Sequence, residues 1–125
     1  MPVDFEIDHQ TRLVHARAHG PVTLHELFDY FDAITLQEAA AYPKLFDARE
    51  MVPNVSDDEV MALGARVSAY AAFDPRGAVA VVVNSDEARD GVRRYMNLSG
   101  ADRPVRMFTT VEAARTWLLT QRIND

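Results

Sequence analysis

The sequence contains a recurring unit in which Ser or Thr is followed three residues later by Glu and then by apolar residues at helical spacing. This unit occurs at Thr23–Glu26, Ser56–Glu59 and Thr109–Glu112. It is typical of a capping box, in which the hydroxyl accepts a hydrogen bond from an N–H of the first helical turn and the Glu side chain accepts one from the N–H of the capping residue. We therefore predict that three helices start at these positions.

The start of the chain alternates apolar and polar residues, as expected for two half-buried strands. Residues 3–7 alternate apolar and acidic side chains, and residues 12–19 alternate again after residues 9–10. A two-residue loop between them gives an antiparallel hairpin whose apolar side chains share one face, with Phe5 paired to Val14. The opposite face would carry Asp4, Glu6, His15, Arg17 and His19.

Three later apolar segments predict parallel strands. They span residues 43–48, 78–83 and 105–108. Segment 78–83 is the most apolar of the three and is rich in Val, so we expect a central strand that is covered on both faces. Residues 50–55, which contain Pro53, are expected to form a loop before the next helix.

Four helices are expected to alternate with these strands. The first three are predicted to end near residues 40, 73 and 100. Their N-terminal caps, and that of the fourth, are Thr23, Ser56, Ser85 and Thr109. The sequence therefore predicts one α/β domain over residues 1–125, with a five-stranded mixed sheet, an N-terminal antiparallel hairpin followed by parallel β-α repeats, and four main helices. The crossovers are expected to be right-handed.

Composition restricts the class of partner. The chain has a net charge of −6 and no Cys, which disfavours nucleic acid as a partner and excludes disulfides and thiolate chemistry. It has no apolar run of about 20 residues, the length that spans a bilayer. Its start lacks the basic and apolar regions of a secretory signal. We expect a cytoplasmic protein without integral membrane association.

No group of residues in the sequence specifies a reaction. The hydroxyls of Ser56, Ser85 and Thr109 are assigned to helix caps, and neither a nucleophile turn nor a glycine-rich phosphate loop is present. His15 and His19 share a strand face, but four residues of strand separate their Cα atoms by about 13 Å, too far for two ligands of one Zn²⁺. We therefore expect no metal, no cofactor and no catalysis. An enzyme with an unrecognised acid–base site is a further alternative.

Polar residues lie at the carboxyl ends of the three predicted parallel strands. Asp47 and Arg49 end the first of these strands, Asn84 and Ser85 follow the second, and residues 109–110, both Thr, follow the third. Ligands of open α/β sheets bind at this edge, and the adjacent helix N-termini favour an anion. We predict a binding site for a partner or ligand at Asp47, Arg49, Ser56, Asn84 and Ser85. The alternative interpretation is that Asp47 and Arg49 form an ion pair with each other.

Longer sequence patterns resemble a known family. The hairpin ends in residues 20–23 (Gly-Pro-Val-Thr), and residues 45–49 are Leu-Phe-Asp-Ala-Arg. The pattern continues in residues 79–85 (Val-Ala-Val-Val-Val-Asn-Ser), 105–108 (Val-Arg-Met-Phe) and 112–118 (Glu-Ala-Ala-Arg-Thr-Trp-Leu). Over nearly its whole length the chain resembles the SpoIIAA-like proteins of the STAS superfamily.

This resemblance implies a mixed sheet built as a right-handed β-α superhelix, and a role in protein–protein regulation. In the anti-anti-sigma factors of the superfamily, a partner kinase phosphorylates a Ser at the start of the helix after the third strand, which switches an interface. Ser56 is the nearest match to that position. Asp47, however, is followed by Ala48, Arg49 and a longer loop instead of the Asp-x-Ser-Gly sequence of those factors. The resemblance thus makes Ser56 a candidate phosphorylation site.

Two functions follow for this chain. The first is a non-catalytic STAS-like binding or regulatory module that engages a protein partner, or a second copy of itself, through the region from Asp47 to Ser56. The alternative is a small apolar ligand or lipid binding protein with peripheral membrane association, because looser relatives of the fold, similar to Sec14-type domains, bind apolar ligands between helices and sheet. Large apolar residues at helical spacing suit this alternative and equally suit an ordinary core. They are Phe28, Tyr30 and Phe31 of the first helix and Met61, Tyr70 and Phe73 of the second.

Overall fold

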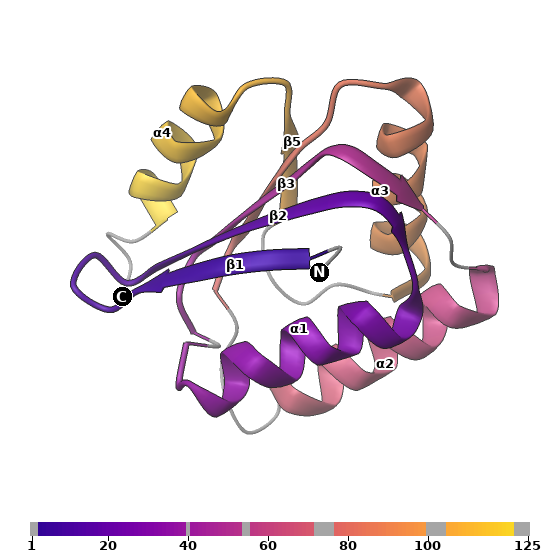
Figure 1. Cartoon of the computed structure of the whole chain (residues 1–125), viewed down its shortest axis with the longest axis horizontal. Helices are drawn as coiled ribbons and strands as arrows, with labels where there is room; N and C mark the ends of the chain where they lie inside the picture. Colours follow the sequence, from indigo (N-terminus) through magenta and orange to yellow (C-terminus); the bar gives the residue numbers. More distant parts are fainter. Residues whose placement is uncertain (1–2, 40, 54–55, 72–76, 100–104, 122–125) are drawn as a thin grey trace.

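Within the residues that the structure describes, five strands form one mixed sheet that is flanked by four helices (Figure 1). The computed structural model describes residues 3–39, 41–53, 56–71, 77–99 and 105–121. In chain order the elements are β1 (Val3–Asp8), β2 (Leu13–Val22), α1 (Leu24–Leu36), β3 (Lys44–Pro53), α2 (Asp57–Ala71), β4 (Val79–Val82), α3 (Asp86–Ser99), β5 (Val105–Phe108) and α4 (Val111–Gln121).

The strands lie in the order β1-β2-β3-β4-β5. β1 and β2 are antiparallel, and every later pair of neighbours is parallel. β5 has its predicted bounds, and β4 occupies the middle of predicted segment 78–83. The predicted fold class, an antiparallel hairpin followed by parallel β-α repeats, is confirmed.

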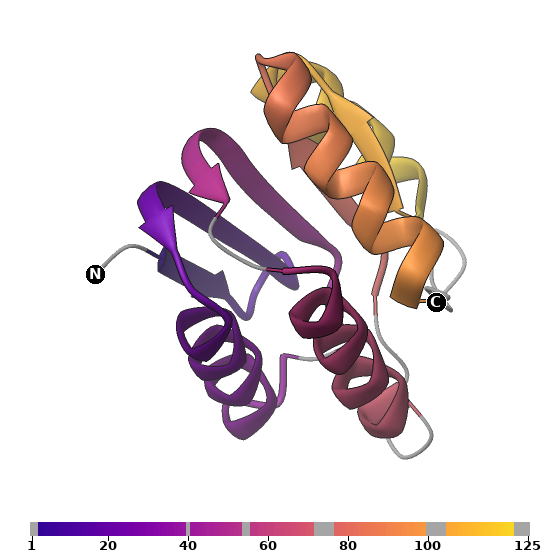
Figure 2. The same ribbon diagram turned by 90° about the vertical axis from the view of Figure 1, so that its right-hand side faces the viewer.

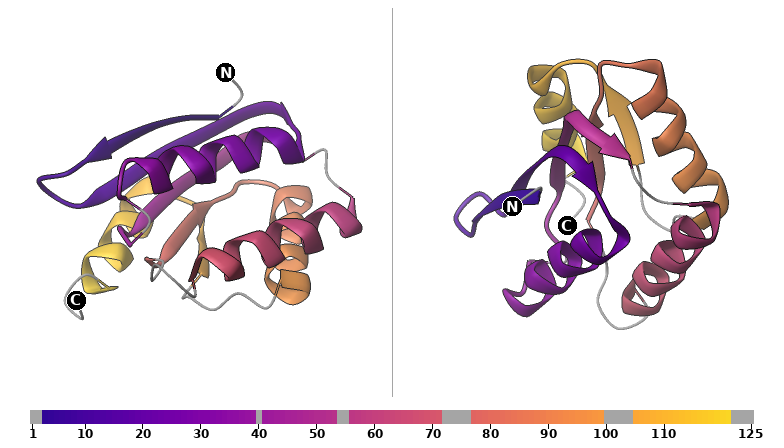
Figure 3. Two further views of the ribbon diagram at one scale, coloured as in Figure 1. Left: turned by 90° about the horizontal axis from the view of Figure 1, so that it is seen from below. Right: turned by 45° about the vertical axis from the view of Figure 1, so that its right-hand side comes forward.

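Helices cover both faces of the sheet. α1 packs on β1 and β2, and α3 packs on β3 and β4. The strand register aligns Ala16 with Phe46 and Phe46 with Val81, which places these two helices on one face. α2 runs beside α1 (Figure 2). α4 lies on the other face, where Ala114 and Leu118 pack against β3 and β4 (Figure 3).

The hairpin places its apolar side chains on one face as predicted, but the predicted register is wrong by two residues. Phe5 pairs with Ala16 instead of Val14. The loop spans four residues between Asp8 and β2, because Asp8 Oδ1 accepts hydrogen bonds from the N–H groups of residues 10–11, at 2.9 and 3.1 Å. Side chains alternate along a strand, so a shift of two positions keeps each one on its predicted face.

Two of the three predicted capping boxes are confirmed. At α1, the Thr23 hydroxyl accepts from the N–H of Glu26 at 3.4 Å, and Glu26 Oε1 accepts from the N–H of Thr23 at 3.0 Å. At α2, Ser56 and Glu59 form the same reciprocal pair at 3.2 and 3.0 Å. Ser85 caps α3 as predicted, accepting from the N–H three residues on at 3.1 Å.

The third predicted capping box, Thr109–Glu112, is wrong by one residue. Thr110 is the N-cap of α4, and its hydroxyl accepts from the N–H of Ala113 at 3.2 Å. Phe108, the last residue of β5, stays in the sheet, because its carbonyl accepts a hydrogen bond from the N–H of Val83 at 2.9 Å. The chain therefore turns out of the sheet over both Thr residues, and the second one starts the helix.

α1 ends at Leu36, before its predicted end near residue 40. Glu38 adopts a left-handed conformation, with φ of 61°. Its N–H and that of the next residue donate to the carbonyls of Thr35 and Ile34, at 3.1 and 2.9 Å. These two bonds define a Schellman motif, in which Gly usually takes the position of Glu38. The end of this helix therefore lacks the usual sequence signal.

The predicted ends of the second and third helices, near residues 73 and 100, lie outside the described residues. In the described part of the chain, α2 reaches Ala71 and α3 reaches Ser99. Among the described residues, no helix has both the length and the apolar character needed to cross a membrane.

β3 is longer than predicted. It continues through residues 50–53, which were expected to form a loop. β2 also continues past Gly20 to Val22, and the two strands stay paired over this extension. A register shift between Arg17 and His19 separates the two paired stretches. The pairing of β2 with β3 therefore extends past the apolar segment into residues for which local composition predicted a loop.

We expect Thr110→Ala to lower the free energy of unfolding by about 1 kcal/mol, because an N-cap hydroxyl contributes about that much. Thr109→Ala leaves this cap in place and should change the free energy by less than about 0.5 kcal/mol. Urea unfolding followed by Trp117 fluorescence measures both changes. A larger loss in Thr109→Ala than in Thr110→Ala would contradict the assigned cap.

Candidate functional site

An open polar pocket, here named the carboxyl-edge pocket, lies on the α4 side of the sheet, beside the middle of β3 and the carboxyl end of β4. It is lined by His15, Arg17, Asp47, Arg49, Glu50, Asn84 and Val111. Three of the predicted site residues, Asp47, Arg49 and Asn84, therefore meet in one place. Ser56 and Ser85 are not among the described lining residues, and their hydroxyls accept the cap bonds of α2 and α3.

Asp47 and Arg49 form a two-point ion pair in this pocket. Arg49 Nε donates to Asp47 Oδ1 at 2.9 Å, and Nη2 donates to Oδ2 at 2.7 Å. The Arg49 backbone N–H also donates to Oδ1, at 3.2 Å. The hydrogen bonds from Arg49 hold the pKa of Asp47 below its usual value, although burial of this side chain, which is 8% exposed, opposes that shift. The alternative interpretation of the sequence, a mutual ion pair, is confirmed.

His15 lies beside this ion pair on β2. Arg115 of α4 approaches its ring, with 3.4 Å between Nη2 and Nδ1. Burial lowers the pKa of His15, and the positive charges of Arg115 and Arg17 lower it further. The neutral form of His15 is therefore favoured in the folded protein.

Sequence reasoning placed His15 and Arg17 on the outer face of the hairpin but not in the site. The pairing of β2 with β3 brings these two side chains into the site, because it sets Arg17 directly opposite Asp47. No local sequence pattern could place Arg115 in the site, because it lies 100 residues away from His15 in the chain.

The carboxyl-edge pocket is lined mainly by polar and charged side chains. Arg17 and Arg49 lie beside Asp47 and Glu50, so charges of both signs are present. Asp47 stays ionised and paired, and its lowered pKa opposes a role as a general acid near neutral pH. Among the described residues, no group of three or more His, Cys, Asp or Glu side chains is placed to hold a metal ion. The arrangement suits hydrogen bonds and ion pairs with polar groups of a partner.

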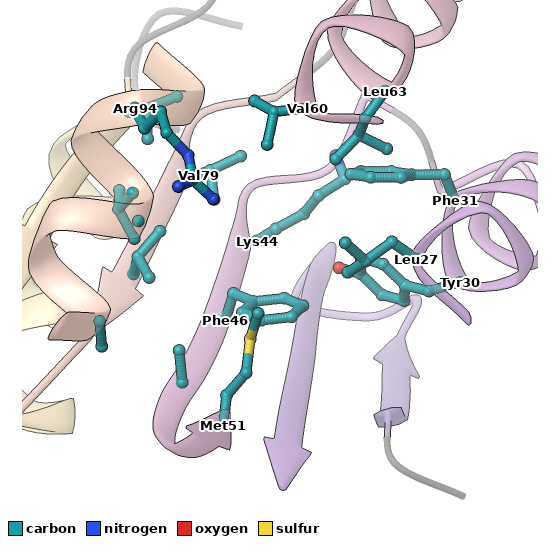
Figure 4. A pocket seen from close by; sticks show the side chains of 16 residues that line it. Leu27, Tyr30, Phe31, Lys44, Phe46, Met51, Val60, Leu63, Val79 and Arg94 are labelled. Atoms are coloured by element: carbon teal, nitrogen blue, oxygen red, sulfur yellow. The ribbon is translucent and has the colours of Figure 1, made fainter. Parts of the chain in front are cut away.

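A second site, here named the apolar cavity, lies on the opposite face of the sheet. It is a partly open cavity with a volume of about 160 Å³, and it lies between α1, α2, α3 and strands β3 to β5 (Figure 4). Tyr30, Phe31 and Phe46 line it together with aliphatic side chains of the three helices and the sheet. An engineered cavity of about 150 Å³ with a similar lining stays dry and binds benzene. The apolar cavity is therefore large enough for a small ligand.

Only part of the predicted set of large apolar residues lines this cavity. Tyr30 and Phe31 do so. Phe28 instead lies under the guanidinium of Arg66, 4.4 Å from ring centroid to Cζ, and Met61 is exposed. Two further members lie outside the described side chains: Tyr70 and Phe73.

Two cationic side chains also line the apolar cavity. Lys44 is 2% exposed, and its Nζ donates to Tyr42 O at 2.7 Å. Arg94 comes from α3, and its Nε lies 3.0 Å from Asp57 Oδ1 at the start of α2. Figure 4 shows the Lys44 side chain running along the cavity wall and the Arg94 guanidinium turned toward the cavity. Sequence reasoning missed both, because Lys and Arg are rarely buried in apolar surroundings.

Comparison with solved structures assigns the architecture to the SpoIIAA-like fold. An uncharacterized protein of the DUF3478 family from Shewanella loihica PV-4, with a SpoIIAA-like fold, superposes with a TM-score of 0.65 at 13% identity, over 93% of this chain and 93% of that chain. The anti-sigma factor antagonist SpoIIAA in its unphosphorylated form gives a TM-score of 0.56 at 15% identity, over 94% of this chain and 97% of that chain. No family model matches the chain, and no curated protein matches it.

The chain thus has an α/β fold built on a five-stranded mixed sheet. More specifically, it has the SpoIIAA-like fold that the sequence resemblance implied, with the N-terminal hairpin and the four helices of that architecture. At these identities, the likeness is one of fold.

Lowering the pH should destabilise the protein in part through His15. Its pKa is lower in the folded protein than the ordinary value of 6.5, so the unfolded chain binds the proton more readily and stability falls as the pH drops through that region. His15→Gln should therefore lose less unfolding free energy than the wild type between about pH 7.5 and pH 5 in urea titrations. Asn84→Ala, a neutral change in the same pocket, should keep the wild-type difference. Equal losses in His15→Gln and the wild type would refute this assignment.

Proposed function

We propose that the protein is a non-catalytic regulatory module that binds a protein partner, or a second copy of itself, through the surface from Asp47 to Ser56. The supporting observation is apolar exposure around this surface. Val52 near the end of β3 is 50% exposed, and Met61 in α2 is 52% exposed. Exposed apolar side chains bordered by polar groups are typical of interaction sites. The cytoplasmic location of the protein stays a prediction.

The polar part of this proposed contact is the carboxyl-edge pocket together with the first turns of α2 and α3. Asp47, Arg49 and Asn84 would contact the partner in the pocket, and Ser56 and Ser85 would do so at the first turns of α2 and α3. The likeness to SpoIIAA supports the same class of function, because that protein is an antagonist of an anti-sigma factor. Its action on another protein is the model for this proposal.

We further propose phosphorylation of Ser56 as a switch of this surface. Ser56 is exposed and precedes three acidic residues, Asp57, Asp58 and Glu59. A phosphate adds up to about two negative charges at neutral pH. It would repel the Glu59 carboxylate, which accepts from the Ser56 N–H at 3.0 Å. Modification would thereby weaken the capping box and change the charge of the contact surface.

We expect Val52→Asp and Arg49→Glu each to weaken partner binding at least about tenfold, because a central apolar or Arg contact commonly contributes that much. Affinity capture from native lysate and light scattering over a range of protein concentrations measure partner binding and self-association. Leu119→Asp is the matched control, since Leu119 is also largely exposed, at 60% against 50% for Val52, but lies on α4. A monomer at all concentrations that recovers no partner would count against the proposal.

The apolar cavity favours a second candidate function, the binding of a small apolar ligand, with peripheral membrane association as the setting for its delivery. The cavity wall is almost entirely apolar. A small apolar ligand that covers this wall would remove apolar surface from water, which is favourable by about 25 cal/mol per Å².

Native mass spectrometry of gently purified protein tests the second candidate. We expect an adduct on the wild type. Val92→Phe should remove it, because Val92 lines the cavity and the larger side chain fills part of the volume. Ala113→Phe, on an exposed position of α4, is the matched control and should retain the adduct. A clean apo mass for the wild type would contradict this function.

A further inference from the structure

Two aromatic rings form part of the wall of the apolar cavity. Phe31 of α1 and Phe46 of β3 line the cavity, and both are only partly buried. Among the described residues, each of these rings contacts one other ring, that of Tyr30, with centroids 5.2 and 5.6 Å apart. Part of each ring therefore borders the cavity instead of another aromatic side chain.

Met51 adds a thioether to the same wall (Figure 4). A thioether sulfur makes favourable contacts with an aromatic ring. Two aromatic rings in edge-to-face or offset geometry also gain more than the burial of their area. A saturated ring lacks the charge distribution on which both contacts depend. The wall therefore distinguishes an aromatic ring from a saturated ring of similar size.

The two cations of the wall already have partners within the protein. Lys44 Nζ donates to Tyr42 O at 2.7 Å. Arg94 Nε lies 3.0 Å from Asp57 Oδ1. A charged ligand would have to replace such contacts, and it would lose its own hydration in a mostly apolar site. An uncharged ligand leaves the contacts of both cations in place.

From this lining we propose that the apolar cavity binds its ligand through an uncharged aromatic ring. The ring would lie against Phe31, Phe46 and Met51. Because the cavity is partly open, a polar substituent on the ring can extend out of it. This inference rests on the second candidate function and names the chemistry of its ligand.

Titration of the ¹⁵N-labelled full chain with benzyl alcohol and with cyclohexylmethanol tests this inference, because the two alcohols are similar in size and differ in the character of the ring. The saturated alcohol is the more hydrophobic, so burial of apolar surface alone would favour it. We expect benzyl alcohol to bind at least about threefold more tightly instead, with amide shifts centred on residues that line the cavity. Benzoate has the same ring with a negative charge and should bind more weakly than benzyl alcohol.

Phe31→Leu and Phe46→Leu each remove one ring from the wall and keep an apolar side chain. Each should reduce or reverse the preference for benzyl alcohol. Phe28→Leu is the matched control and should keep the preference. Phe28 lies on the same helix as Phe31, but its ring lies under the guanidinium of Arg66 and is not part of the described cavity lining.

The wild-type comparison alone decides the question if a variant does not fold. A preference smaller than this, or tighter binding of cyclohexylmethanol, would overturn the inference and leave the ligand-binding function intact. Tighter binding of benzoate in the cavity, or benzyl alcohol shifts confined to surface residues, would overturn it as well. Failure of both alcohols to bind in the cavity would overturn the second candidate function together with the inference.

Discussion

The parallel pairing between β2 and β3 is the constraint on which both sites depend. It joins the N-terminal hairpin to the β-α repeats and continues past a register shift between Arg17 and His19 to the pair of Val22 with Pro53. On one face it sets the outward side chains of β2 beside Asp47, which creates the carboxyl-edge pocket. On the other face it aligns the apolar side chains of the two strands beneath α1. The hairpin therefore lines the carboxyl-edge pocket directly, and it supports β3, whose other face lines the apolar cavity.

β3 contributes to both sites because successive side chains of a strand point to opposite faces. Lys44, Phe46 and Ala48 line the apolar cavity, whereas Asp47 and Arg49 line the carboxyl-edge pocket. One backbone layer thus separates a charged surface from a mostly apolar interior. Protein recognition and ligand binding can therefore coexist in this fold without competing for the same side chains.

Features whose bonding partners lie within one helical turn were predicted from the sequence better than features formed by contacts between distant segments. The hydroxyl and Glu at Thr23 and Ser56 predicted two helix starts, because both bonding partners lie within that turn. At residues 109–110 the same rule selected Thr109, whereas the structure uses the adjacent Thr110 as the helix cap. The left-handed residue after the end of α1 is Glu38 instead of the usual Gly, so no local signal marked this helix end. The neighbours of Asp47 on β2, and the cations of the apolar cavity, come from strands and helices far apart in the sequence, so no local spacing encodes them.

The strand order leaves β1 and β5 as the margins of the sheet. β1 carries Asp4, Glu6 and Asp8 at alternate positions, and all three are exposed. A foreign strand of the same kind that docked along β1 would bring like carboxylates together, and such repulsion opposes edge-to-edge growth. The acidic side chains of β1 thereby oppose the edge-to-edge assembly that would form open-ended fibres.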